Sequence, residues 1–271
     1  MGNYKFSTLN RAYMACGHNS VLKDDDGKWY LLYHARFDDG SEYHEVRVHS
    51  IQFNRDGWPV VAPNEYSGDA IDLSGYNTSD IAGTYEFINH GNDTGSKIYS
   101  SSEITLTADG NITGALKGSW FELPGTNDAV ITFYGGQRYT GKFIAAKDEK
   151  GTKVMSFTAV GPNNQTIWGN KKTAYTGQPR TDSSAEKFED GTAFTIKNAN
   201  SNLYLSLDGG KTAAGTNVYQ SETADKWKLF SAGDDCYYIA PAGADGKSVV
   251  LDCSGQKADN GTNICVYTNK E

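Results

Sequence analysis

The stretch DGKWYLLYH at residues 26–34 decides the fold of the first part of this sequence. Its Asp-Gly pair signals a turn, and the apolar and aromatic residues that follow are typical of a β-strand. A second run, VRVHSIQF at residues 46–53, follows another Asp-Gly pair at residues 39–40. The two runs predict neighbouring strands of one antiparallel sheet.

The composition extends this prediction to the whole chain. The 271 residues include 30 Gly, and Tyr outnumbers Phe by 17 to 11. Abundant Gly, Thr, Ser, Asn and Asp, together with aromatic residues that favour strands, are typical of turn-rich β structure. A chain of this length is expected to form about two domains, or three small ones. We therefore expect an all-β protein.

Turn and linker signals divide the chain into segments. Short strands are predicted about every ten residues between residues 80 and 175, which suits a small β-barrel or sandwich. Within that segment Asp109-Gly110-Asn111 is a hairpin-turn signal. Two prolines near residue 60 close the first segment, and a polar, punctuated stretch follows Tyr175. The predicted domains are residues 1–66, 67–176 and 193–271, with a linker at residues 177–192.

The last predicted domain contains an internal repeat. The stretch LYLSLD at residues 203–208, followed by GTNVY, is echoed by VVLD at residues 249–252, followed by GTNIC. The two Leu-Asp pairs are 44 residues apart and the two Gly-Thr-Asn triplets are 46 apart. Such units need about three copies to close a core. Because fewer are present, we expect this domain to be incomplete at its C-terminus, and Met1 to be an internal residue of a longer protein.

Charge and hydropathy exclude two classes of partner. The chain has 33 acidic and 25 basic residues, a net charge of −8, and no Lys/Arg cluster. Nucleic acid and anionic membrane surfaces are therefore not expected as partners. No apolar run reaches the roughly 18 residues of a membrane span, and residues 1–15 contain no apolar core of a signal peptide.

The four cysteines are unevenly placed. Cys16 stands alone, whereas Cys236, Cys253 and Cys265 lie within the last 36 residues. One late disulfide and free thiols are both compatible with this spacing.

Four co-occurring motifs in the first segment carry a family resemblance. They are GHNSV at residues 17–21, DGKWYLLYH, YHEVRVH at residues 43–49 and DGWPVVAP at residues 56–63. Together they resemble the last blade of the five-bladed β-propeller of endo-arabinanases in glycoside hydrolase family 43. The resemblance implies a partial propeller at residues 1–66 and a secreted, extracellular enzyme.

The same resemblance assigns a metal role to one histidine. In that family the His of the Gly-His-Asn-Ser motif holds a hydrated divalent ion, commonly calcium, close to the catalytic acids, and this position is His18. Calcium prefers oxygen ligands, so water must complete its shell. The alternative is a hydrogen-bonded structural histidine.

The two later segments resemble domains that accompany such enzymes. Residues 81–87 and 166–171 resemble the β-barrel-like C-terminal domain of arabinanases. Residues 193–271 resemble a partial ricin-type β-trefoil lectin of the kind found in family 13 carbohydrate-binding modules. That resemblance implies sugar contacts by Asp208 and Asp252, with Tyr219 as an aromatic platform, and a disulfide between Cys253 and Cys265. A structural turn role for either Asp is the alternative, and Asp225 stands where the family has Gln.

No catalytic acid or base is assigned to this chain. Glu45, Arg47 and His49 share a strand face by their period of two and are interpreted as a solvated, ion-paired surface. The resemblance implies that the carboxylates for inverting hydrolysis lie upstream. The favoured hypothesis is the C-terminal portion of an endo-α-1,5-L-arabinanase-like enzyme acting on plant arabinan or related hemicellulose and pectin side chains. The alternative is a non-catalytic polysaccharide-binding protein.

Overall fold

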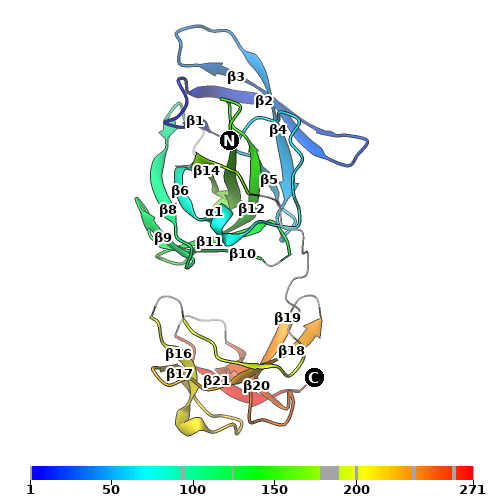
Figure 1. The fold of residues 1–271 in the computed structure, drawn as a ribbon, viewed down its shortest axis with the longest axis vertical. Helices are drawn as coiled ribbons and strands as arrows, with labels where there is room; N and C mark the ends of the chain where they lie inside the picture. The colour runs from blue at the N-terminus through cyan, green and yellow to red at the C-terminus, as the bar shows by residue number, and fades with distance from the viewer. Residues whose placement is uncertain are drawn as a thin grey trace. The chain divides into compact units, whose positions relative to one another are not determined.

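The structure, a computed structural model, describes residues 2–92, 95–123, 125–177, 189–198, 201–233, 236–257 and 261–270. Its contacts divide the chain into two compact units, Met1–Ala185 and Glu186–Glu271 (Figure 1). Most of the linker predicted at residues 177–192 lies outside the described residues. Within the described ranges no helix has the length and apolar character that a membrane crossing requires.

A six-stranded sheet forms the N-terminal part of the first unit. Its order is β5-β4-β3-β2-β1-β7, and only β1 and β7 pair in parallel. The strands are β1 Asn3–Lys5, β2 Tyr13–Lys23, β3 Trp29–Phe37, β4 Glu45–Phe53, β5 Pro59–Val61 and β7 Ile98–Ser100. Trp29 pairs with Ile51, which confirms that the two runs of the opening motif are neighbouring antiparallel strands. The meander β2 to β5 is the sheet expected of one propeller blade; the propeller itself stays a prediction.

A closed barrel forms the rest of the first unit. Its strand order is β10-β11-β12-β13-β14-β6-β8-β9. The elements are α1 Thr78–Ile81, β6 Gly83–Asn89, β8 Ser102–Leu106, β9 Asn111–Gly114, β10 Gly118–Glu122, β11 Asp128–Phe133, β12 Gln137–Lys147, β13 Lys153–Val160, the 3-10 helix η1 Pro162–Asn164 and β14 Thr166–Ala174. Gly110 adopts a φ of 83° in the turn between β8 and β9, which confirms the hairpin signal there. The small barrel predicted from strand spacing is therefore confirmed.

Aromatic residues fill the barrel. Tyr85, Phe143 and Phe157 lie in its buried core, together with Trp120 and Tyr139. Trp120 and Tyr139 are buried, so their rings pack within the barrel and are not available to stack on sugars.

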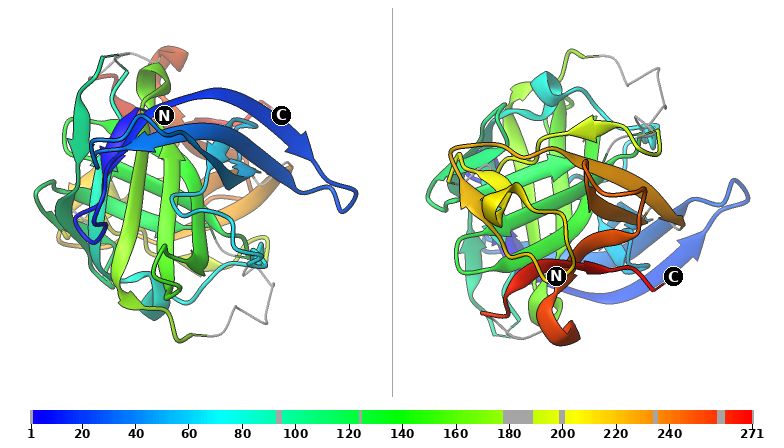
Figure 2. Two further views of the ribbon diagram at one scale, coloured as in Figure 1. Left: turned by 90° about the horizontal axis from the view of Figure 1, so that it is seen from above. Right: turned by 90° about the horizontal axis from the view of Figure 1, so that it is seen from below.

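The N-terminal sheet lies against the barrel (Figure 2). Buried residues of both form one hydrophobic core. Trp168 of β14 is 1% exposed and stacks on His49 of β4, with ring centroids 6.0 Å apart and an interplanar angle of 16°. Its ring also meets the rings of Tyr4 and His90 edge to face, at 5.2 Å and 4.4 Å. The barrel therefore covers a sheet face that an isolated blade would leave in water.

The interpretation of Glu45, Arg47 and His49 as a solvated face is wrong for His49. Its side chain is completely buried, its Nδ1 lies 2.8 Å from the carbonyl oxygen of Ala62, and its Nε2 lies 3.0 Å from the Tyr33 hydroxyl. Glu45, Arg47 and His49 do share one face of β4, but Trp168, more than a hundred residues away in sequence, covers the His49 end of that face. Arg47 remains ion-paired to Glu65, at 3.2 Å.

One glycine allows β12 and β13 to approach closely, and we expect Gly141→Ala to destabilise the barrel. A Cβ at Gly141 would lie 1.8 Å from the backbone oxygen of Thr158. Overpacking of this kind costs about 1–3 kcal/mol, measurable as a lower urea midpoint. At Gly17 the nearest atom to an added Cβ is 3.7 Å away. The matched control Gly17→Ala should therefore leave the midpoint nearly unchanged, and equal effects of the two changes would contradict the account.

The second unit consists of short hairpins around a small core. Its elements are β15 Ala193–Phe194, β16 Tyr204–Leu207, the 3-10 helix η2 Asp208–Gly210, β17 Val218–Ser221, β18 Trp227–Gly233, β19 Cys236–Pro241, β20 Val249–Cys253, the 3-10 helix η3 Ser254–Gln256 and β21 Ile264–Thr268. Strands pair as β15-β18-β19, β16-β17 and β20-β21. Trp227, Leu207 and Val266 are buried in its core.

The structure gives the repeat a single offset of 46 residues. In both copies a hairpin strand runs into a 3-10 helix, η2 in one and η3 in the other, whose second residue, Gly209 or Gly255, has a positive φ. The first residue of each helix accepts the same backbone bond: Asp208 N–H donates to Asn217 O, and Ser254 N–H donates to Asn263 O. Asp208 therefore corresponds to Ser254, and Asp252 corresponds to Ser206.

Candidate functional site

His18 is presented to solvent by an irregular stretch of β2. The pairing of β2 with β3 shifts register on both sides of Gly17, and His18 is exposed with a φ of 52°. A left-handed conformation is uncommon for a residue with a Cβ and often marks a bulge that redirects a side chain. The His18 ring lies 5.8 Å from the His34 ring, which lies 4.6 Å from the His44 ring.

The surroundings of His18 restrict the kind of metal site that it can form. Among the described residues no group of three or more His, Cys, Asp or Glu side chains is arranged to hold a metal ion. The surroundings of His18 therefore fit a hydrated cation that one imidazole contacts and whose coordination shell water completes. The described residues there do not form a cage of protein oxygens.

The three sugar-binding candidates of the second unit occupy two different repeats. Asp208 is exposed at the start of η2, and Tyr219 is half-exposed on β17 opposite Ser206. Asp252 lies on β20 opposite Cys265. With the 46-residue offset, Asp208 corresponds to Ser254 and Tyr219 corresponds to Cys265. Asp208 and Asp252 therefore do not occupy equivalent places in the two repeats.

A cavity beside Asp252 contains an aromatic residue that the sequence analysis missed. It has a volume of about 740 Å³ and is lined by Asp252, Tyr267, Tyr238 and Asn263. The register pairs Asp252 with Cys265 and Val250 with Tyr267, so Asp252 and Tyr267 share one face of the hairpin. A carboxylate beside an exposed ring is a chemistry suited to sugars, because the carboxylate accepts hydroxyl hydrogens while the ring packs on C–H groups. Tyr267 could have been found from its place in the strand after the second Gly-Thr-Asn.

Asp225 and Trp227 have structural roles. Asp225 Oδ2 accepts a hydrogen bond from the backbone N–H of Leu207 at 2.7 Å, and Trp227 Nε1 donates to Leu205 O at 3.0 Å. The departure from Gln at position 225 thus preserves an acceptor that holds β16 in place.

The disulfide expected between Cys253 and Cys265 is not formed, and both thiols are free. Cys253 lies opposite Ile264 and Cys265 lies opposite Asp252, so adjacent positions send the two sulfurs to opposite faces of the hairpin. Cys253 is exposed, whereas Cys265 is buried and its pKa is raised mainly by burial.

We expect a thiol reagent to label Cys253 much faster than Cys265 in the native chain. A thiolate is the reactive species, and burial disfavours it at Cys265. Mass spectrometry of peptides after timed alkylation, without reductant, measures both rates. Recovery of a peptide pair linked through Cys253 and Cys265 would contradict the assignment.

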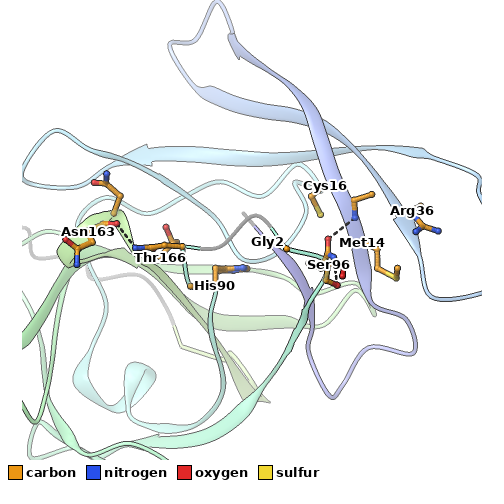
Figure 3. Close-up of a pocket in the computed structure, with 14 residues that line it drawn as sticks. Gly2, Met14, Cys16, Arg36, His90, Ser96, Asn163 and Thr166 are labelled. Carbon is orange, nitrogen blue, oxygen red and sulfur yellow. Dashed lines mark hydrogen bonds between the residues drawn. The ribbon is translucent and has the colours of Figure 1, made fainter.

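A further pocket lies between the N-terminal sheet and the barrel (Figure 3). Its volume is about 730 Å³, and its lining includes His90, Cys16, Arg36 and Asn163. His90 is buried, and neither of its ring nitrogens has a hydrogen-bond partner among the described residues. Burial lowers the pKa of His90 to about 3, so its ring is neutral at physiological pH.

Two family models match separate parts of the chain. Residues 63–169 match a glycoside hydrolase family 43 model described as a C-terminal lipocalin-like domain, which covers most of the barrel. Residues 184–267 match a model described as ricin-type β-trefoil lectin domain-like. The resemblances inferred for the middle and last segments are thus confirmed.

Curated relatives and solved structures match a little under two thirds of the chain. The extracellular endo-α-(1→5)-L-arabinanase 2 of Bacillus subtilis (strain 168) is 39% identical over 176 residues, which are 63% of this chain and 37% of the relative. The extracellular endo-α-(1→5)-L-arabinanase of Thermotoga petrophila is 39% identical over 185 residues, 62% of this chain and 37% of the relative. The chain thus spans well under half the length of these relatives.

The solved structures that resemble this chain are also family 43 and arabinanase structures. The glycoside hydrolase family 43 YxiA protein from Bacillus licheniformis has a TM-score of 0.60 and 39% identity, covering 64% of this chain and 38% of that one. The endo-1,5-α-L-arabinanase from Thermotoga petrophila has a TM-score of 0.59 and 30% identity, covering 63% and 40%. Residues 63–169 are therefore similar to the C-terminal domain of family 43 glycoside hydrolases, residues 184–267 are similar to ricin-type lectin-like domains, and the curated relatives reported above are extracellular endo-arabinanases.

Proposed function

We propose that this chain serves in the hydrolysis of plant α-1,5-arabinan, as the C-terminal, carbohydrate-binding portion of a secreted endo-arabinanase-like enzyme. The observation that supports this most is the 39% identity of 62–63% of the chain to two extracellular arabinanases. Inverting hydrolysis needs a carboxylic acid and a carboxylate about 6.5–9.5 Å apart. In this proposal those groups lie outside the 271 residues, and the chain by itself binds arabinan without cleaving it.

His18 is the residue through which the first unit contributes to the active centre in this proposal. Its exposed imidazole projects from the irregular stretch of β2, with the His34 ring beside it. A hydrated divalent cation, calcium by the resemblance, would supply positive charge there. Calcium titration of the chain followed by the imidazole NMR signals of His18 tests this: saturable shifts at His18 support the site, and shifts equal to those with sodium contradict it.

In this proposal the second unit binds the polysaccharide, and the hairpin face that carries Asp252 and Tyr267 is its principal site. Retardation of the chain in native gels that contain arabinan tests binding, and reducing-sugar release is measured in parallel. Retardation without release is the expected result. Absence of retardation in arabinan, combined with retardation in xylan or galactan, would reject arabinan as the ligand.

We expect Asp252→Ala to weaken arabinan binding at least about tenfold, since a hydrogen bond to a charged group contributes about 1.5–3 kcal/mol. Tyr267→Ala should weaken it up to about tenfold, because the ring that packs on C–H groups is lost. Asp208→Ala should have a smaller effect, because Asp208 corresponds to Ser254 and not to Asp252. Gel retardation coefficients compare the three variants. A larger effect of Asp208→Ala would contradict the 46-residue alignment of the sites.

A non-catalytic polysaccharide-binding protein is the second candidate, and the lectin-like match over residues 184–267 favours it. For the 271-residue chain the two candidates predict the same binding. They differ at His18, since only the enzyme proposal requires a cation there.

A further inference from the structure

A second candidate binding site lies in the first unit, where the end of the N-terminal sheet meets the barrel. A cavity of about 500 Å³ is enclosed by the turn at residues 26–28, the start of β3, the end of β4, residues 66–73 and Lys142 of β12. Its volume lies within the range of about 300–1,000 Å³ that is usual for small-molecule sites. We name it the Phe53 cavity; none of His18, Asp208, Tyr219 and Asp252 lines it.

Aromatic rings form the walls of the Phe53 cavity. The rings of Trp29 and Phe53 meet edge to face with centroids 5.7 Å apart, and those of Tyr30 and Tyr66 lie 4.9 Å apart. Phe53 is 43% exposed and Tyr66 is 38% exposed. These rings therefore keep apolar surface in water within a concave site, where the C–H groups of a sugar ring can cover it.

Gln52 lines this cavity, and its side-chain amide contains a buried donor without a partner among the described residues. Its side chain is 8% exposed, and its Oε1 accepts a hydrogen bond from Asn127 Nδ2 at 2.9 Å. The orientation is fixed, because the same Asn127 nitrogen also donates to Phe143 O at 3.1 Å. Gln52 Nε2 is left buried with no hydrogen-bond partner among the described residues. Such a donor costs about 1–3 kcal/mol unless a ligand accepts from it.

The charges around the cavity are balanced in sign. Asp26 and Asp69 are acidic, and Lys28 and Lys142 are basic. Lys142 Nζ is paired to Asp128 Oδ1 at 2.9 Å, which leaves it two further N–H donors. Because the two acidic and two basic residues offset each other, the cavity does not attract an anion or a cation. The aromatic walls and the N–H donors suit a neutral, polyhydroxylated ligand.

We propose that the Phe53 cavity is a glycan-binding site that takes one or two residues of a neutral oligosaccharide. Phe53 and Tyr66 pack against its C–H groups, while Gln52 Nε2 and Lys142 Nζ donate to its hydroxyl oxygens. Through this site the first unit binds polysaccharide independently of the lectin-like unit. It rests on the proposed function in one respect, which is the choice of arabinan as the favoured glycan.

The test measures binding of linear α-1,5-arabinohexaose, β-1,4-xylohexaose and β-1,4-galactohexaose by calorimetry. The full chain carries Asp252→Ala and Tyr267→Ala throughout, so that the second unit contributes less to the signal. On that background Phe53→Ala and Gln52→Leu should each weaken binding of the preferred hexasaccharide about tenfold. Phe53→Tyr should retain it, because the ring stays in place. Trp58→Ala, which removes a 56% exposed ring outside the cavity, is the matched control.

Gln52→Leu separates a binding role from a structural one. Because Gln52 Oε1 accepts from Asn127 Nδ2, the Leu variant should have a lower unfolding midpoint, whereas a binding role predicts, in addition, the tenfold loss of affinity in the folded variant. Equal affinity of the Phe53→Ala, Gln52→Leu and Trp58→Ala variants would overturn the Phe53 cavity and leave the proposed function standing. Phe53-dependent binding of xylohexaose or galactohexaose alone would support the cavity and contradict arabinan. No binding of any hexasaccharide would overturn the cavity.

Discussion

Replacing Trp168 by alanine is expected to lower the free energy of unfolding of the first unit by about 3–5 kcal/mol, as large-to-small changes of buried aromatic residues do. Trp168 is 1% exposed and belongs to the shared core of the sheet and the barrel. Its loss also leaves His49 without its stacked ring and uncovers one face of the sheet. Chemical unfolding followed by circular dichroism measures the change.

The matched control is Trp58→Ala, since Trp58 is exposed and surface substitutions usually change stability by less than about 0.5 kcal/mol. Limited proteolysis adds a second readout. In the Trp168→Ala variant, cleavage should begin within residues 1–66 while the barrel persists. Equal destabilisation by the two changes would show that the shared core does not hold the sheet.

Acid should destabilise the first unit through its two buried histidines. His49 Nδ1 faces the carbonyl oxygen of Ala62, which can only accept, so this nitrogen carries the proton and Nε2 accepts from Tyr33. Burial lowers the pKa of His49, with Arg47 acting in the same direction and Glu65 against it. Burial also lowers the pKa of His90, to about 3.

The sign of the pH effect follows from these shifts. Below the unfolded pKa of about 6.5 the unfolded chain binds protons that the folded chain does not. Stability is therefore complete above that pH and falls as the pH decreases, by up to about 1.4 kcal/mol per pH unit for each histidine. At pH 5 each buried histidine contributes a loss of up to about 2 kcal/mol.

Urea unfolding between pH 7.5 and pH 5 measures this loss, and variants assign it. His90→Leu should remove about half of the pH dependence without lowering stability at pH 7.5, because neither ring nitrogen has a partner among the described residues. The exposed His18 provides the control His18→Ala, which should keep the slope. An unchanged slope in His90→Leu would contradict the assignment.

Local sequence predicted the elements well and their distant contacts poorly. Turn signals and runs of strand-forming residues predicted the antiparallel pair around Trp29 and the small barrel with its hairpin at Gly110. These features were predictable because they depend on residues close together in the sequence. The burial of His49 could not be predicted in this way, since it depends on Trp168.

The candidate site shows the same limit. Leu-Asp occurs in both repeats, which suggested that Asp208 and Asp252 correspond. The backbone bonds of the two 3-10 helices show a shift of two residues instead. A shift of two keeps the face of a strand, so the alternation of side chains could not reveal the error. The expected disulfide failed because spacing alone does not say to which face each sulfur points.

The central claim is that this chain binds α-1,5-linked arabinan in the service of an arabinanase-like enzyme. Calorimetric titration of the unaltered 271-residue chain with α-1,5-arabinohexaose and with β-1,4-xylohexaose tests it most directly. The account predicts saturable binding of the arabinohexaose that is at least about tenfold tighter than binding of the xylohexaose, a difference of about 1.4 kcal/mol. Equal affinity for both, or preference for the xylohexaose, would contradict it.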